Sequence, residues 1–269
     1  SLRDLSRQER AQRFGRALET ARMAFQPIVD LKRNRVYGYE ALLRTKEPSM
    51  PSPVDVVRAA DQLGRTAELG ARVRELSVQS FMRAGDGVLL FLNLHTSDLL
   101  DPALFDAHSV LAPIASRVVL EVSEHSPIDR IKDARARASV LKFNGFRIAI
   151  DDLGAGYAGL TSFITLEPDI VKIDMALIRG IDASEVKQNL VRSIVELCGR
   201  LGMGVVAEGV ETSAELHAVR PADILRRIVH AAHTQNAKHV GRESVVAGIG
   251  REAQFEIGFD GVHAAILPL

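Results

Sequence analysis

The sequence has a single cysteine, no tryptophan, no excess of either charge and no long apolar run. Cys198 alone cannot form an internal disulfide, which excludes a small secreted scaffold built on disulfides. The 34 Lys and Arg residues balance the 34 Asp and Glu residues, which argues against a nucleic-acid-binding protein with a broadly basic surface. The longest apolar stretch near the middle, Val88–Leu92, is far shorter than the roughly 20 residues that a membrane-spanning helix needs. The charged N-terminus lacks the apolar core of a signal peptide, so we expect a cytoplasmic location.

What the sequence does contain is typical of a soluble enzyme-sized domain. The chain has 269 residues, of which 46% are apolar and 25% charged, and this length fits one large domain, or two small ones, with a substantial core. No low-complexity segment or linker divides it. We therefore expect a lead-in helix over residues 1–20, followed by one domain over residues 21–269.

Short apolar runs alternate with longer segments of helical periodicity. Near-continuous apolar strands followed by helices are typical of parallel strands that helices cover on the outside. About seven or eight such strands favour a (β/α)8 barrel, and a doubly wound open sheet is the alternative. The strands are expected at Met23–Val29, Arg35–Leu43, Val88–Leu94, Arg117–Val122, Phe146–Ile150, Asp169–Ile173 and Gly204–Ala207, and the helices at Pro53–Leu63, Thr66–Arg83, Ile128–Phe143, Ala158–Leu166, Glu185–Leu201 and Thr212–Val219, with Asp98–Ile114 helical or mixed.

The C-terminal part breaks this alternation. Pro221 interrupts the pattern, a basic helix is expected over Ile224–Ala237, and glycines punctuate the rest. The basic stripe of that helix favours a solvated face, and a surface for a protein partner is the alternative. It consists of Arg226, Arg227, His230 and His233.

Polar and acidic side chains stand at the ends of successive predicted strands. In a parallel barrel these ends open on one face, where barrel enzymes place their active sites. Several carboxylates at one depth would repel one another unless cations compensate them. Oxygen ligands suit Mg²⁺ or Mn²⁺, and a pair of such ions suits phosphoryl chemistry, so we expect a divalent metal centre. Its candidates are Glu40, Asn93, Glu121, Asp151, Asp152, Lys172 and Glu208.

A glycine-rich segment after one strand supports an alternative. Residues 154–159 match the G-x-G-x-x-G pattern of a dinucleotide-binding turn, and Asp174 follows at about the right distance. However, Asp151 and Asp152 directly precede these glycines and would face a pyrophosphate without compensation. A glycine-rich loop beside a metal centre is the favoured interpretation.

The motifs together resemble one family. Glu40-Ala41-Leu42 with Arg44 is similar to the signature of EAL-domain cyclic di-GMP phosphodiesterases, and the resemblance runs from about Phe25 to Glu215. Its other motifs are Gln26-Pro27-Ile28, Asn93-Leu94, Glu121-Val122-Ser123-Glu124, residues 151–157, residues 169–174 and residues 207–212.

The resemblance implies a modified TIM barrel with one antiparallel strand. It implies hydrolysis of cyclic di-GMP to linear pGpG with two divalent cations, Mg²⁺ or Mn²⁺. Asp151 would bridge the two cations and Lys172 would orient the attacking water or steady the developing charge. By motif match, the metal ligands would be Glu40, Asn93, Glu121, Asp151, Asp152 and Glu208.

The resemblance also implies how the nucleotide and a second subunit are bound. Gln26 and Arg44 would hold the nucleotide, with Asn93, Asp152 and Glu211 beside it. The loop from Asp152 to Leu160 would couple the metal centre to a homodimer interface, with Glu211 anchoring the loop. Such domains occur in the cytoplasm of bacteria, often within larger sensory proteins.

The chain departs from the family pattern after Leu216. The expected strand with Gln-Gly-Tyr is absent at the usual distance, and Ile257–Pro268 resembles it in altered form, with His263 at the glutamine position. Residues 217–255 would then be an insertion, which could bind a protein partner; an unrelated tail from about Arg220 is the alternative. The departure leaves two functions open, an active phosphodiesterase and a weak or inactive domain that binds cyclic di-GMP as an effector.

Overall fold

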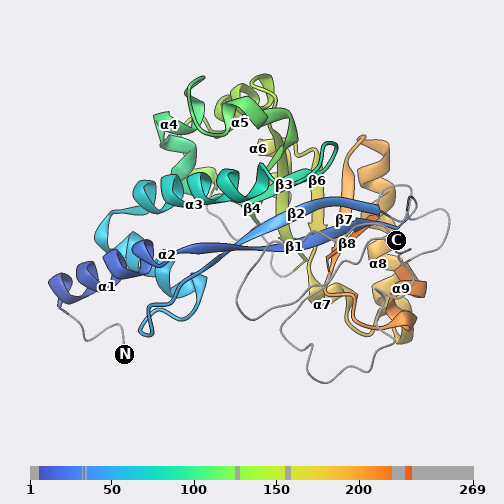
Figure 1. Cartoon of the computed structure of the whole chain (residues 1–269). Helices are drawn as coiled ribbons and strands as arrows, with labels where there is room; N and C mark the ends of the chain where they lie inside the picture. The colour runs from blue at the N-terminus through green and yellow to red at the C-terminus, as the bar shows by residue number, and fades with distance from the viewer. Residues whose placement is uncertain are drawn as a thin grey trace.

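The computed structural model describes residues 6–31, 33, 35–124, 128–154, 159–219 and 228–231. Its centre is a closed barrel in which the strands pair in chain order, β1 to β8 (Figure 1). The closed barrel rules out the open doubly wound sheet. The strands are β1 Arg22–Asp30, β2 Arg35–Arg44, β3 Leu89–Asn93, β4 Val118–Ser123, β5 Arg147–Leu153, β6 Ile170–Ile173, β7 Gly204–Glu208 and β8 Ile228–Ala231.

Strand β1 runs against the direction of the rest of the barrel. It pairs antiparallel with β2 on one side and with β8 on the other. All the remaining neighbours pair parallel. The expectation of a modified TIM barrel with one antiparallel strand is therefore confirmed.

Helices and turns connect the strands and cover the barrel. The long β1–β2 ribbon runs out of the barrel toward α1 and α2 (Figure 1). The α-helices are α1 Arg7–Glu19, α2 Pro53–Leu63, α3 Thr66–Phe81, α4 Pro102–Phe105, α5 Ala134–Phe143, α6 Gly159–Leu166, α7 Met175–Ile178, α8 Glu185–Arg200 and α9 Ser213–Val219, and the 3-10 helices are η2 Thr96–Leu100, η3 Ala112–Arg117, η4 Ile128–Arg130 and η5 Ile181–Ala183.

Capping residues in the sequence mark where several of these helices begin or end. Ser52 and Asp55 form a reciprocal capping box at the start of α2, and Gly64 ends this helix in the left-handed conformation. A capping-box pair is also present at the start of α9, since the Glu215 amide donates to Thr212 Oγ1 over 3.1 Å and the Thr212 amide donates to Glu215 Oε2 over 3.1 Å. None of the helices among the described residues is long and apolar enough to span a membrane.

The barrel interior is packed directly beneath the ends of its strands. Side chains alternate between the two faces of a strand, so a residue two positions earlier points the same way as the residue at the strand end. The apolar cluster inside the barrel stands two positions before the polar candidates on five strands. Its residues Phe91, Val119, Ala149, Ile170 and Val206 precede Asn93, Glu121, Asp151, Lys172 and Glu208 respectively, and Ile28 and Leu89 complete the cluster.

One helix prediction, between β4 and β5, needs correction. The helix expected over Ile128–Phe143 is divided into η4 and α5, with Asp133 between them in the left-handed region at φ 57°. The segment Asp98–Ile114 is mixed, as expected, and contains two 3-10 helices and the short α4.

The basic helix predicted over Ile224–Ala237 is wrong at residues 228–231, which form strand β8. A barrel must pair its last edge, and β8 closes it by pairing with both β7 and β1. The segment Ile257–Pro268 with His263 lies outside the described residues, as do Arg226, Arg227 and His233. Strand β8 lies within the predicted insertion at 217–255, whose bounds stay a prediction.

Candidate metal centre and active site

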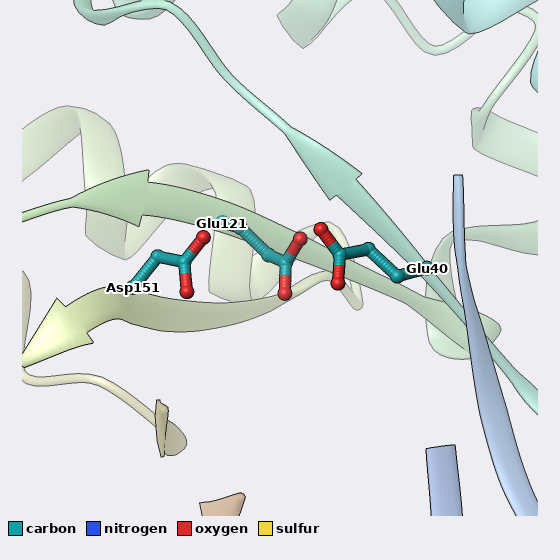
Figure 2. A group of neighbouring side chains, drawn as sticks. All are labelled: Glu40, Glu121 and Asp151. Carbon is teal, nitrogen blue, oxygen red and sulfur yellow. The ribbon is translucent and has the colours of Figure 1, made fainter. Parts of the chain in front are cut away.

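The site lies at the carboxyl ends of the parallel strands. Glu40 on β2, Glu121 on β4 and Asp151 on β5 point their carboxylates toward one another (Figure 2). Lys172 on β6 and Glu208 on β7 complete the group from the other side of the barrel. Because side chains alternate between the two faces of a strand, these side chains lie in the layer above the apolar cluster inside the barrel.

The Lys172 ammonium is the centre of this group. The side chain is fully buried, with 0% of its surface exposed. Its Nζ lies near one oxygen of each of four carboxylates. The distances are 2.7 Å to Glu208 Oε1, 2.8 Å to Glu121 Oε1, 2.9 Å to Asp151 Oδ1 and 3.4 Å to Glu40 Oε2.

Burial and mutual repulsion perturb these acids. Burial raises the pKa of Glu121 well above its ordinary value, although Lys172 opposes this shift. Burial likewise raises the pKa of Glu208 to about 7, against the attraction of Lys172. Burial alone would lower the pKa of Lys172, but the surrounding carboxylates raise it well above its ordinary value. Lys172 is therefore a permanent cation at neutral pH, and a further positive charge would be needed to keep all the carboxylates ionised.

The donor set fits two divalent cations. Two groups of carboxylates each offer ligand atoms within 4.8 Å of one another, and Asp151 belongs to both. Both carboxylate oxygens of Glu121 are buried without a hydrogen-bond donor, although one contacts Lys172. Carboxylate oxygens at this spacing match the ligand preference of Mg²⁺ and Mn²⁺. The groups are Glu40, Glu121 and Asp151, and Asp151, Asp152 and Glu208.

Asn93 and Asp152 flank this centre. The Asn93 amide donates from Nδ2 to Glu40 Oε1 over 3.2 Å, which leaves its carbonyl oxygen as a potential ligand. The Asp152 backbone takes a positive φ of 60°, which is uncommon for a residue with a side chain. Its amide donates to Asp151 Oδ1 over 3.0 Å, so the two consecutive acids hold each other in place.

The predicted nucleotide-binding residues lie on the β1–β2 ribbon. Gln26 is directly opposite Glu40 in the antiparallel register and is buried. Arg44 lies four residues beyond Glu40 on the same strand and is half-buried. Burial, and then the nearby Arg22, lowers the pKa of Arg44.

Glu211 contacts residues outside the carboxylate cluster. Its carboxylate forms an ion pair with Arg179, and its amide donates to Glu215 Oε2 over 2.9 Å. Residues 155–158 of the glycine-rich loop lie outside the described part of the chain, so the anchoring of that loop by Glu211 stays a prediction.

Glu124 contacts the glycine-rich segment, a role that sequence reasoning missed. It is buried, and its Oε2 accepts a hydrogen bond from the Gly154 amide over 3.3 Å. Its own amide donates to the Asp151 carbonyl over 2.9 Å. Its position three residues after Glu121, in the same short motif, was the available signal.

The dinucleotide-binding alternative is not supported. Asp174, which would hold a ribose in that interpretation, accepts a hydrogen bond from the Ala176 amide over 2.7 Å and caps the start of α7. The two acids before the glycines belong to the carboxylate groups described above.

Comparison with known proteins agrees with this geometry. The family model of the EAL domain matches residues 8–226. The chain belongs to the EAL domain family.

Known relatives of this EAL domain include two Escherichia coli proteins. It is 29% identical over 202 residues to the probable cyclic di-GMP phosphodiesterase PdeG, covering 71% of this chain and 40% of PdeG. It is 31% identical over 199 residues to the blue light- and temperature-regulated antirepressor BluF, covering 71% of this chain and 48% of BluF. The chain thus spans less than half the length of either relative.

A solved structure of a Klebsiella pneumoniae protein has the same fold. The EAL domain superimposes on the manganese and cyclic di-GMP complex of BlrP1 with a TM-score of 0.66 and 32% sequence identity. The match covers 79% of this chain and 54% of BlrP1.

Proposed function

We propose that this EAL domain is a metal-dependent phosphodiesterase that hydrolyses cyclic di-GMP to linear pGpG. The observation that carries the proposal is the position of Asp151, which belongs to both carboxylate groups and contacts the buried Lys172. A carboxylate shared by two cation sites is the arrangement expected of a two-metal phosphodiesterase.

The proposed ligands divide between two sites. Glu40, Glu121 and Asp151 would hold one cation, with the carbonyl oxygen of Asn93 beside them. Asp151, Asp152 and Glu208 would hold the second. When bound, Mg²⁺ or Mn²⁺ supplies Lewis acidity and makes water a nucleophile at neutral pH.

Lys172 would stabilise charge rather than carry a proton. Its Nζ is enclosed by carboxylates, which raise the pKa of Lys172 and favour the protonated form. An ammonium fixed in a buried site stabilises negative charge that develops on phosphoryl oxygens, because it needs no reorganisation during the reaction. Hydrolysis adds water across one P–O3′ bond, so the product keeps a 5′-phosphate and gains a 3′-hydroxyl.

Gln26 and Arg44 would hold the nucleotide beside the metal centre. The antiparallel register places Gln26 opposite Glu40, at the edge of the carboxylate cluster. Arg44 offers the planar guanidinium that suits phosphate. Glu211 would act indirectly, by anchoring the loop after Asp152.

A weak or inactive effector is the second candidate. The related protein BluF is an antirepressor by name, which is a regulatory role and supports this candidate. The Gln-Gly-Tyr motif is absent at its usual place, which favours this candidate. The intact carboxylate cluster favours the enzyme.

Incubation of the protein with cyclic di-GMP and Mn²⁺, followed by chromatography for pGpG, tests the proposal. Glu121→Gln should reduce turnover by at least about a hundred-fold, because it removes a buried charged ligand. Glu196→Gln, at an acidic position on α8, is the matched control and should keep wild-type turnover. Binding of cyclic di-GMP by wild type without any product would overturn the enzyme in favour of the effector.

We further propose a homodimer through the loop after Asp152. The helix that follows this loop, α6, leaves Ile164 exposed, and the adjacent α5 leaves Val140 and Phe143 exposed. Exposed apolar residues gathered on neighbouring helices are typical of an interaction surface. Sedimentation equilibrium of wild type and Ile164→Asp would test this: the variant should be monomeric, and a monomeric wild type would contradict the dimer.

A further inference from the structure

Arg22 and Arg44 face each other directly across the β1–β2 ribbon. They are register partners at the end of the ribbon that leaves the barrel. Opposite residues in an antiparallel pair point to the same face of the sheet, and like charges in this position are destabilising. An anion bound between the two arginines would relieve this repulsion.

The two arginines lie on the face that leads to the metal centre. Arg22, Ala24 and Gln26 share one face of β1, as do Arg44, Leu42 and Glu40 on β2, because side chains alternate along a strand. Glu40 belongs to the carboxylate cluster, so this face continues outward from the cluster. Arg44 lies four positions after Glu40 on the strand, a distance of about 13 Å at the usual rise per residue.

The opposite face of the ribbon is closed. Met23 and Leu43 point to that side and belong to the buried core. On the face with the arginines, Ala24 and Leu42 are only half-buried. In the described part of the chain, packing therefore leaves this face of the ribbon partly accessible to a ligand.

Neither guanidinium is neutralised within the described residues. Arg44 donates from Nη1 to the carbonyl of its neighbour Leu43 over 2.9 Å. In the described part of the chain, neither arginine is within ion-pair distance of a carboxylate.

The charge balance of the metal centre indicates what the arginine pair would bind. Five carboxylates and one ammonium carry a formal charge of −4, which two divalent cations would neutralise. A cyclic dinucleotide brings two phosphodiesters, and only one of them is cleaved at the metals. The second phosphodiester needs its own positive charge, which the two arginines could supply in bidentate geometry.

We propose that Arg22 and Arg44 form one anion-binding subsite for the phosphodiester that is not cleaved. Arg22 is thus a specificity-determining residue that favours a dinucleotide over a substrate with a single phosphodiester. This inference rests on the proposed phosphodiesterase function.

The test compares two substrates. Wild type and Arg22→Ala are assayed with Mn²⁺ on cyclic di-GMP and on bis(p-nitrophenyl) phosphate, which has one phosphodiester and no second anionic group. The variant should raise KM for cyclic di-GMP about ten-fold, the usual loss for a charged hydrogen bond, and leave kcat/KM for bis(p-nitrophenyl) phosphate unchanged. Arg22→Lys should recover part of the loss, and Arg22→Glu should lose more because its carboxylate would pair with Arg44.

Arg35→Ala is the matched control, since Arg35 is an exposed arginine at the other end of β2. An unchanged KM for cyclic di-GMP in Arg22→Ala, with an active wild type, would overturn the subsite alone. An equal loss on both substrates would also overturn it, because Arg22 would then act on the metal centre or the fold. If wild type binds cyclic di-GMP without cleaving it, the dissociation constants replace KM in the same comparison. If wild type neither cleaves nor binds cyclic di-GMP, the proposed function fails, and the subsite fails with it.

Discussion

At the residue scale, the centre of the site is one buried lysine among four carboxylates. An isolated buried charge is costly, and Lys172 is tolerated because the surrounding acids compensate it. The positive charge of Lys172 also reduces the repulsion between these carboxylates. The same residues therefore affect both the stability of the barrel and the chemistry of its site.

Glu47 is a second compensated acid, remote from the site. Hydrogen bonds from Arg16 Nε over 2.8 Å and from Ser49 Oγ over 2.5 Å lower its pKa to about 2. An acid with a lowered pKa stabilises the folded state above its unfolded pKa of about 4.5, and that stability is lost as the pH falls toward 2.

Glu47→Gln should therefore lower the free energy of unfolding by about 1–2 kcal/mol at pH 7, a value discounted because Arg16 is half exposed. The difference from wild type should shrink as the pH falls from 4.5 toward 2. Urea unfolding at several pH values measures this, with Glu19→Gln at the end of α1 as the control. A constant difference across that range would show that the ionised carboxylate is not the source.

At the element scale, the end of β5 is where the fold constrains the site most tightly. Gly154 follows the two consecutive acids and takes a φ of 106°, which side chains rarely allow. A Cβ at this position would clash with the side chain of Leu177, whose Cγ would be only 2.9 Å away. Glu124 holds the Gly154 amide from the neighbouring strand.

We expect Gly154→Ala to reduce turnover by at least about ten-fold, since small displacements of catalytic groups are costly. The matched control is Gly64→Ala, because Gly64 has a φ of 69° but open space around its Cα. It should cost about 1 kcal/mol of stability and leave turnover unchanged. Steady-state kinetics and thermal unfolding of both variants separate the two effects; wild-type turnover in Gly154→Ala would contradict the constraint.

At the scale of the whole molecule, β8 closes the barrel. Val229 pairs with Val206 of β7 on one side and with Asp30 of β1 on the other. Without this strand, both neighbours would present an unpaired edge. Closure also fixes the place of β1, and with it the ribbon that carries Gln26, Arg22 and Arg44.

Val229→Pro should lower the free energy of unfolding by at least about 2 kcal/mol, because proline removes a ladder hydrogen bond inside a sheet. Val229→Thr keeps the β-branched shape and the amide, and should cost less. Chemical denaturation measures both variants. Equal stability of Val229→Pro and wild type would place this segment outside the barrel.

Local sequence pattern was sufficient to predict most strands and the residues at their ends. Short apolar runs predicted the strands, and the polar residues that follow them predicted the strand ends, because the two-residue period of a strand needs no tertiary information. These polar residues are Asn93, Glu121, Asp151, Lys172 and Glu208. The prediction of β8 failed for the opposite reason. Ile228–Ala231 is a short run among basic residues, and only the need to pair the edges of β7 and β1 makes it a strand.

Contacts between residues that are distant in the chain depend on the tertiary fold. The four carboxylates around Lys172 come from separate strands, and barrel closure sets their distances. The contact of Glu124 with Gly154 and the register that places Arg22 opposite Arg44 also join segments that are distant in the chain. Such pairings depend on the strand order and on one reversed strand, and local periodicity contains no information about either.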